Sequence, residues 1–110
     1  MRIEFGIGIG FDRKGTPIDS ETAEVRIQQA LRLVADAFGG AFLIRGDGGW
    51  VDNGHLIMEP GIVIVADTPN QSVSAARKLA LVLATIFNQA AVHITILPDV
   101  WSTDVRNPQE

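Results

Sequence analysis

The chain opens with a strict alternation of large apolar residues and small or charged ones. From Ile3 to Phe11 every odd position is apolar and every even position is Glu or Gly. A period of two is typical of a β-strand with one buried face. Residues 92–96 alternate in the same way and Pro98 follows them. The pattern therefore predicts a first strand over 3–11 and a last strand that ends before Pro98.

Two other stretches have the spacing of amphipathic helices. Between residues 20 and 38 apolar side chains recur three and four positions apart, with Asp19 and Ser20 as N-cap candidates and Gly39-Gly40 directly after them. A broader apolar stripe extends over residues 70–90 and begins next to Pro69 or Asn70. We expect one helix over 20–38 and a second over 70–90.

The middle of the chain mixes short apolar runs with turn-forming residues. Residues 41–45 are apolar up to Arg45 and are bounded by glycines, which predicts a short strand. Residues 46–55 have the composition of a turn, with Trp50 at its centre. Residues 56–66 predict a third strand with a bulge or kink at 59–61, and its apolar second half is typical of a strand covered on both faces.

The predicted order is strand, helix, strand, strand, helix, strand. Right-handed crossovers fold this order most simply into a ferredoxin-like α+β sandwich, an antiparallel four-stranded sheet with both helices on one face. The first and third strands are then central. One hundred and ten residues suffice for one domain, which we expect over residues 1–98, followed by a polar tail at 99–110 that is ordered only near Trp101.

Composition and charge narrow the class of protein. Hydrophobic residues make up 46% of the chain and charged residues 20%, which is typical of a globular domain. The net charge of −4 argues against nonspecific binding to nucleic acid. No apolar run is long enough for a bilayer and the N-terminus lacks a signal-peptide pattern, so we expect a cytoplasmic protein with no membrane partner. Without cysteine, disulfides and thiol chemistry are excluded.

Gly6, Gly8 and Gly10 are the first candidate ligand-binding residues. They alternate inside a predicted strand, whereas a dinucleotide-binding loop places its glycines between a strand and a helix. One face of the strand then lacks side chains, so a protein chain or a small ligand can approach it closely. His93 and Thr95 flank these glycines in the ferredoxin-like order. His93 is either a ligand-binding or general-base residue, or a half-buried histidine satisfied by hydrogen bonds.

Arg45 and Trp50 complete the candidate binding set. Arg45 belongs either to a small anion-binding patch near the strand ends or to an ordinary charged rim. Trp50 is a large ring in a glycine-rich segment, where such a ring is packed or recognises a partner. We expect its replacement by Ala to lower stability or to break assembly.

His55 and Glu59, with Asp47 and Asp52 nearby, have the residue types of a metal site. Their spacing does not match an EF-hand and a third firm ligand is missing, so we expect no metal and no cofactor. The Gly-x-Ser-x-Gly motif of a nucleophile elbow is absent as well. The sequence therefore assigns no catalytic residue.

Several short motifs together resemble an uncharacterised family of small bacterial and phage proteins. They are Phe5-Gly6, the segment Gly46-x-Gly48-Gly49-Trp50 with Glu59 after it, and the late Phe87-x-Gln89-x-x-Val92. The resemblance spans roughly residues 3 to 97. It implies a phage or prophage protein that acts in the host cytoplasm, and it supplies no catalytic residues, because none are established for that family.

Two functions remain open at this point. The first is a non-enzymatic, self-associating module that binds or sequesters a small ligand, anionic and nucleotide-like. The alternative is a small hydrolase or isomerase that uses His93 or the His55/Glu59 region. We expect further copies of this chain as partners and no nucleic acid, because one helix layer leaves the other sheet face for a second copy to cover. Pairing through the edge of the last strand is the competing geometry.

Overall fold

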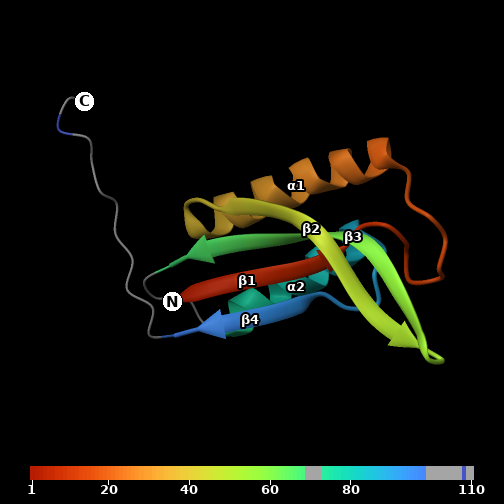
Figure 1. Ribbon diagram of the computed structural model, residues 1–110. Helices are drawn as coiled ribbons and strands as arrows, with labels where there is room; N and C mark the ends of the chain where they lie inside the picture. The colour runs from red at the N-terminus through yellow and green to blue at the C-terminus, as the bar shows by residue number, and fades with distance from the viewer. Residues whose placement is uncertain (69–72, 99–107, 109–110) are drawn as a thin grey trace.

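Figure 1 shows the computed structural model of the chain, which describes residues 1–68, 73–98 and 108. The elements are β1 (Arg2–Gly8), α1 (Ser20–Phe38), β2 (Phe42–Asp52), β3 (His55–Asp67), α2 (Val73–Ile86) and β4 (His93–Leu97). The strands are antiparallel and lie in the order β2-β3-β1-β4. This is the ferredoxin-like α+β sandwich that the sequence predicts, with β1 and β3 in the centre.

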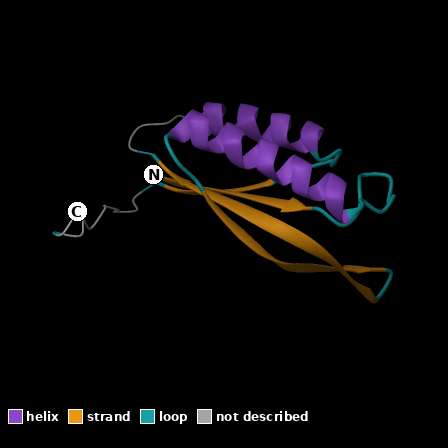
Figure 2. Cartoon of the chain, turned by 90° about the horizontal axis from the view of Figure 1, so that it is seen from above, coloured by secondary structure: helices purple, strands orange, loops and turns teal. Residues whose placement is uncertain are grey.

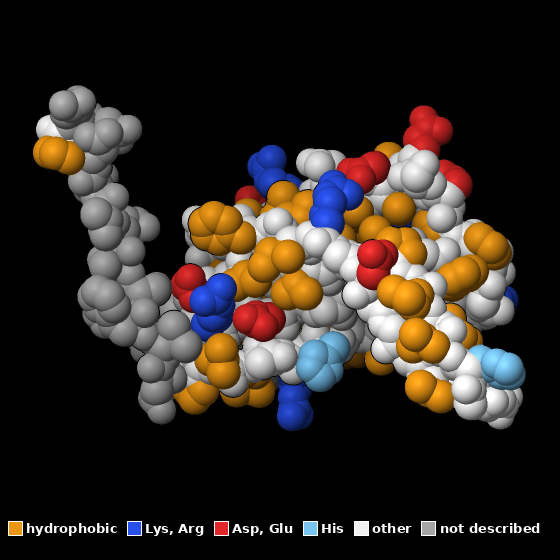
Figure 3. All heavy atoms as spheres, viewed as in Figure 1, with side chains coloured by type: hydrophobic (Ala, Val, Ile, Leu, Met, Phe, Trp, Pro, Cys, Tyr) orange, Lys and Arg blue, Asp and Glu red, His pale blue; other side chains and the backbone are white. Residues whose placement is uncertain are grey.

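The two faces of the sheet differ. Both helices pack against one face, as Figure 2 shows from above. Among the described residues no helix lies on the other face, which is the one turned to the viewer in Figure 3. We call it the open face. Within the described segments, no helix has the length and apolarity that crossing a membrane requires.

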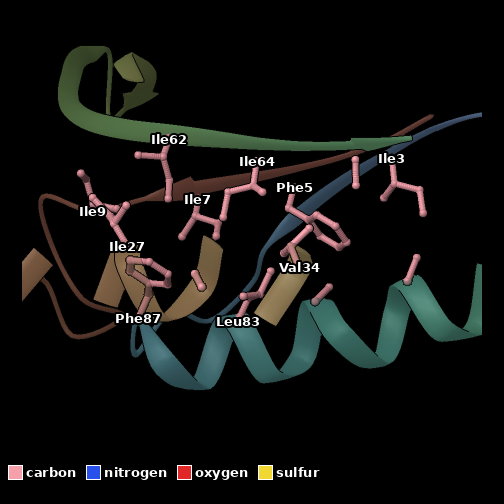
Figure 4. Packing of buried hydrophobic residues seen from close by; sticks show 14 residues of the cluster. Ile3, Phe5, Ile7, Ile9, Ile27, Val34, Ile62, Ile64, Leu83 and Phe87 are labelled. Carbon is pink, nitrogen blue, oxygen red and sulfur yellow. The ribbon is translucent and has the colours of Figure 1, made fainter. Parts of the chain in front are cut away.

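The hydrophobic core fills the space between the sheet and the two helices. Ile3, Phe5 and Ile7 of β1 point toward the helices and are at most 3% exposed. The Phe5 ring stacks on Phe38 of α1 with 6.4 Å between the ring centroids. Figure 4 shows how the labelled members of this cluster meet: Ile3, Phe5, Ile7, Ile9, Ile27, Val34, Ile62, Ile64, Leu83 and Phe87. Because the odd residues of β1 face the core, its even residues lie on the open face.

The first helix begins and ends where the sequence predicts. Asp19 is the N-cap, and its Oδ1 accepts a hydrogen bond of 2.8 Å from the backbone N–H of Thr22. Gly39 ends the helix in the left-handed conformation, with φ of 87°, and its N–H donates to the carbonyl of Ala35. A residue with a Cβ is strained at this φ, which is why a glycine stands there.

Acid should destabilise the fold through carboxylates that accept backbone hydrogen bonds. The pKa of Asp19 is lowered, first by the N–H of Thr22, and that of Asp12 is lowered, first by the N–H of Thr16. A carboxylate whose folded-state pKa lies below its unfolded pKa of about 3.9 stabilises the fold at pH values above about 3.9. This contribution is lost as the pH falls through the folded-state pKa. We expect a level melting temperature between about pH 7 and pH 5 and a fall below about pH 4.

Circular dichroism melts at stepped pH values measure this effect. The Asp12→Asn/Asp19→Asn double variant keeps an oxygen acceptor at both positions but cannot titrate there, so its melting temperature should fall less steeply in acid. An identical acid profile for the double variant would contradict the assignment.

The structure corrects the predicted turn at residues 46–55. β2 and β3 form one long hairpin whose pairs extend without interruption from Phe42 opposite Val65 to Asp52 opposite His55. Only Asn53-Gly54 turns, and both have the positive φ of a two-residue hairpin turn, 50° and 79°. The pairing continues through residues 59–61, so the predicted bulge is wrong, although the hairpin bends away from the helices (Figures 1 and 2).

Three other boundaries differ from the sequence prediction or fall outside the described residues. The pairing of β1 ends at Gly8 rather than at residue 11. α2 ends at Ile86, and Asn88 has a left-handed φ of 51° that the helix cannot continue through. The predicted cap at Pro69 or Asn70 and the predicted order near Trp101 lie outside the described residues.

Candidate functional site

Three glycines form one row across the open face. Gly8 of β1 is paired with Gly61 of β3, and Gly61 is paired with Gly46 of β2. Paired residues of neighbouring strands point to the same face. Three adjacent strands therefore lack side chains on the open face at one level.

This row is the floor of a hollow that we call the glycine trough, with a volume of about 360 Å³. On one side stand Ile44 and Val63, which are paired with each other and lie two residues along their strands from Gly46 and Gly61. On the other side stand Glu59 and Trp50, both on the same face as the glycines. The trough thus has a flat floor, one aliphatic wall, and one wall made of a carboxylate and an indole ring.

Glu59 is fixed in place by the backbone that follows β1. Its Oε2 accepts hydrogen bonds from the N–H groups of Gly10, at 3.1 Å, and Phe11, at 3.0 Å. Its Oε1 lies over Gly8, and a Cβ added at Gly8 would be only 2.5 Å from this oxygen. Within the described part of the chain, no group donates a hydrogen bond to Oε1. A Cβ at Gly10 would lie 3.2 Å from Glu59 Oε2 and 2.9 Å from Pro60 Cδ. The carboxylate therefore needs Gly8 and Gly10 beneath it, and one of its oxygens is left for a ligand.

Gln89, just after α2, holds the same backbone segment from another side. Its Nε2 donates to the carbonyl of Gly8 at 2.8 Å and to that of Phe11 at 2.6 Å. Beyond Gly8 the N–H of Ile9 still donates to the carbonyl of Pro60 in β3. After Ile9 the side chains of Glu59 and Gln89 replace the strand as partners, at the N–H groups of Gly10 and Phe11 and at the carbonyl of Phe11.

The loop after β1 is tied to the end of α2 by a second set of bonds. The N–H of Arg13 donates to the carbonyl of Asn88 at 2.8 Å, and Asn88 Nδ2 donates to Asp12 Oδ2 at 3.3 Å. Asp12 Oδ1 in turn accepts the N–H groups of Lys14 and Thr16. The loop is thus fixed by its own aspartate and by α2.

A second hollow lies between this loop and the hairpin, and we call it the loop hollow. Its volume is about 380 Å³ and its lining comprises Phe11, Asp12, Gly15, Trp50, Ile57, Glu59 and Gln89. Trp50 and Glu59 also line the glycine trough. The two hollows are therefore neighbours that share these two side chains.

The structure brings some of the predicted site residues together on the open face. Gly6 is paired with His93, and a Cβ at Gly6 would lie 3.6 Å from His93 Cβ. Thr95 is paired with Glu4 farther along β4. His93 thus lies beside Gly6 alone of the three glycines and Thr95 lies beside Glu4, and neither residue lines the two hollows.

Arg45 has a different environment from the one an anion-binding patch requires. Its side chain lies on the helix side of β2, where Nη2 donates to Glu24 Oε2 of α1 at 3.0 Å and Nη1 contacts Glu24 Oε1. Each partner stabilises the charge of the other, so the pKa of Glu24 is lowered and that of Arg45 is raised. Of the charged residues that line the trough, Glu59 alone has its side chain on the open face, because Arg45 and Asp47 point to the other face. This distribution does not favour an anionic ligand.

The carboxylates and the histidine of the hairpin do not converge. His55 and Glu59 are four residues apart on one strand, a separation of about 13 Å at roughly 3.3 Å per residue. Asp47 is paired with Pro60 and therefore points to the face opposite Glu59. The described residues contain no group of three or more acidic or histidine side chains placed to hold a metal ion.

Trp50 is 43% exposed and is not part of the core cluster. Its ring lies on the open face opposite Ile57, at the boundary of both hollows. At this position Trp50 contributes little to the stability of the fold. The sequence predicts that replacing Trp50 with Ala lowers stability or breaks assembly, and the position of the ring favours loss of assembly.

No protein-family model matches this sequence, and neither does any curated protein sequence. Solved structures do match. A phage SAM lyase in complex with S-methyl-5′-thioadenosine superposes with a TM-score of 0.60 at 16% identity, over 84% of this chain and 76% of that one. The divalent cation tolerance protein CutA1 from Thermus thermophilus gives a TM-score of 0.57 at 12% identity, over 94% and 88%.

A variant of CutA1 from Pyrococcus horikoshii gives a TM-score of 0.54 at 14% identity, over 91% of this chain and 86% of that one. At such identities the likeness shows the fold, and it agrees with the ferredoxin-like sandwich described above.

Proposed function

We propose that the protein is a self-associating binding module whose glycine trough takes a small, flat ligand of the nucleoside type. The observation that carries this proposal is the row of Gly8, Gly61 and Gly46 beneath the free oxygen of Glu59. A planar ring can lie in van der Waals contact with the bare backbone at Gly46 and Gly61, beside the Glu59 carboxylate that covers Gly8. Ile44 and Val63 provide an apolar side for it. The volume of about 360 Å³ lies within the usual range for small-molecule sites.

The chemistry of the trough favours a neutral ligand or one that donates hydrogen bonds. Glu59 Oε1 is an acceptor, and amino or hydroxyl groups are its natural partners. A nucleoside combines a planar ring with such groups. The phage SAM lyase that shares this fold was solved with S-methyl-5′-thioadenosine, which is a ligand of this type, and this supports the proposal.

The open face also has the character of an association surface. Phe42 is 74% exposed, Ile44 is 54% exposed, and Leu97 of β4 is 40% exposed. Monomeric proteins seldom leave a continuous apolar surface of more than a few hundred Å² to water. We propose that a second copy of the chain covers this face and leaves the trough at the boundary between the copies.

Binding is a better proposal than hydrolysis or isomerisation. Acid–base chemistry needs a titratable pair that converges on one point. His93 lines neither hollow, and His55 lies about 13 Å along the strand from Glu59. Glu59, with one oxygen held by two N–H groups, fits the role of a fixed hydrogen-bond acceptor.

Calorimetry with S-methyl-5′-thioadenosine tests the ligand, and light scattering at micromolar concentration tests the assembly. We expect saturable binding with one ligand per chain and a mass that is a multiple of the chain mass. Ribose 5-phosphate, which has the sugar but no planar ring, serves as the control and should give no binding. Absence of binding by S-methyl-5′-thioadenosine and adenosine, together with a monomeric mass, would contradict the proposal.

A further inference from the structure

We infer that the loop hollow is a second subsite, specific for an organic cation whose charge is spread over methyl groups, such as a methylated ammonium. This inference adds a site to the one proposed above. It rests on the residues around the loop hollow and does not depend on which ligand the glycine trough takes.

Two aromatic residues line this hollow. Phe11 lines it from the loop, and its backbone is fixed on both sides, by Glu59 at its N–H and by Gln89 at its carbonyl. Trp50 lines it from the hairpin and keeps 43% of its surface exposed. Indole and phenyl rings attract cations through their electron-rich faces, and they are the residues that bind methylated ammonium groups in proteins.

The charge around the loop hollow is negative. Asp12 and Glu59 are the charged side chains among the residues that line it. Two backbone N–H groups and Asn88 bind the carboxylate of Asp12 and help to keep its pKa low, so Asp12 is ionised at neutral pH. Arg13 and Lys14 belong to the same loop, but both are exposed and neither lines the hollow. The side chains that line the hollow thus attract a positive charge and repel a negative one.

The hydrogen bonds of these side chains narrow the class of cation. Both oxygens of Asp12 and the Oε2 of Glu59 already accept hydrogen bonds from donors of the chain. The free Oε1 of Glu59 lies over Gly8, which lines the glycine trough and not the loop hollow. The hollow therefore supplies negative charge and aromatic surface, but few acceptors for new N–H donors. A quaternary ammonium such as choline has no N–H groups that need partners, whereas a protonated primary amine has three.

Calorimetric titration with choline and with its neutral isostere 3,3-dimethylbutan-1-ol isolates the charge. The two compounds have nearly the same shape, so we expect choline to bind and the isostere to bind at least about tenfold more weakly. Trp50→Leu and Glu59→Gln should each weaken choline binding roughly 3- to 30-fold. The side chain in Glu59→Gln still has an oxygen that can accept hydrogen bonds from the N–H groups of Gly10 and Phe11, so the loop should stay in place.

Asp36→Asn is the matched control. Asp36 is an exposed residue of α1 paired with Arg32, away from both hollows, and its substitution removes one negative charge, as Glu59→Gln does. We expect choline binding to be unchanged in this variant. Equal binding of choline and the isostere, or an equal loss in Asp36→Asn and Glu59→Gln, would overturn the inference. The binding of S-methyl-5′-thioadenosine in the trough is measured separately, so either proposal can fail while the other stands.

Discussion

Replacing Gly8 with Ala is expected to weaken ligand binding in the glycine trough at least about tenfold, while Gly6→Ala leaves it nearly unchanged. A Cβ at Gly8 would lie 2.5 Å from Glu59 Oε1 and 2.9 Å from its Cδ, so the carboxylate must move. A Cβ at Gly6 would have its nearest neighbour, His93 Cβ, at 3.6 Å, which is ordinary contact. Loss of a hydrogen bond to a charged group costs about 1.5–3 kcal/mol, which corresponds to tenfold or more in affinity.

The two variants form a matched pair because both change Gly to Ala on the same face of the same strand. Any general effect of Ala on the unfolded chain is therefore shared, and the difference isolates the displacement of Glu59. Calorimetry with S-methyl-5′-thioadenosine gives the affinities, and melting temperatures show that both variants are folded. Equal affinities for the two variants would contradict the role given to Glu59.

Gly6→Glu is expected to convert the assembly into monomers. Gly6 lies in the middle of the open face, between Val63 and His93, and a second copy packed there would have to bury the new carboxylate. Burial of an unpaired charge costs several kcal/mol. The same change at Gly8 would test this less cleanly, because its side chain would also displace Glu59.

Light scattering of Gly6→Glu beside Gly6→Ala measures the effect of the charge alone. The Ala variant should keep the wild-type mass. If Gly6→Glu also keeps the wild-type mass, the copies pair through the edge of β4 instead of through the open face. A contact through that edge would leave Gly6 uncovered.

The order and type of the elements could be predicted because periodicity encodes them directly. The alternation in β1 and the helical spacing between Asp19 and Gly39 each correspond to a face buried in the core. The prediction failed at residues 46–55, where four glycines and two aspartates have the composition of a loop. The backbone of residues 46–52 is paired with β3 without interruption, so pairing with a neighbouring strand overrides the local propensity of these residues.

A stronger signal for the hairpin was present in the sequence. Asn53-Gly54 is the preferred dipeptide of a two-residue hairpin turn, and a turn at that point fixes the register of both strands. That register places Gly46 opposite Gly61, so the row of glycines on β2 and β3 follows from the sequence once the turn is recognised.

The rest of the site depends on contacts between distant parts of the chain. Gln89 reaches the carbonyl of Gly8 across 81 positions, and the bond from Gly10 to Glu59 spans 49. No periodicity encodes such contacts. The environment of Arg45 could not be predicted for a similar reason. The register of β2 decides on which face of the sheet Arg45 lies, and its partner Glu24 belongs to α1.

Nuclear magnetic resonance tests the central claim, that the glycine row of the open face is a ligand site, most directly. Glycine amide signals can be followed one by one in a titration of the ¹⁵N-labelled protein with S-methyl-5′-thioadenosine. We expect the largest shifts at Gly8, Gly46 and Gly61, and none at Gly39, which ends α1 away from the trough. Shifts confined to the helices, or no shifts at ligand concentrations well above that of the protein, would contradict the account.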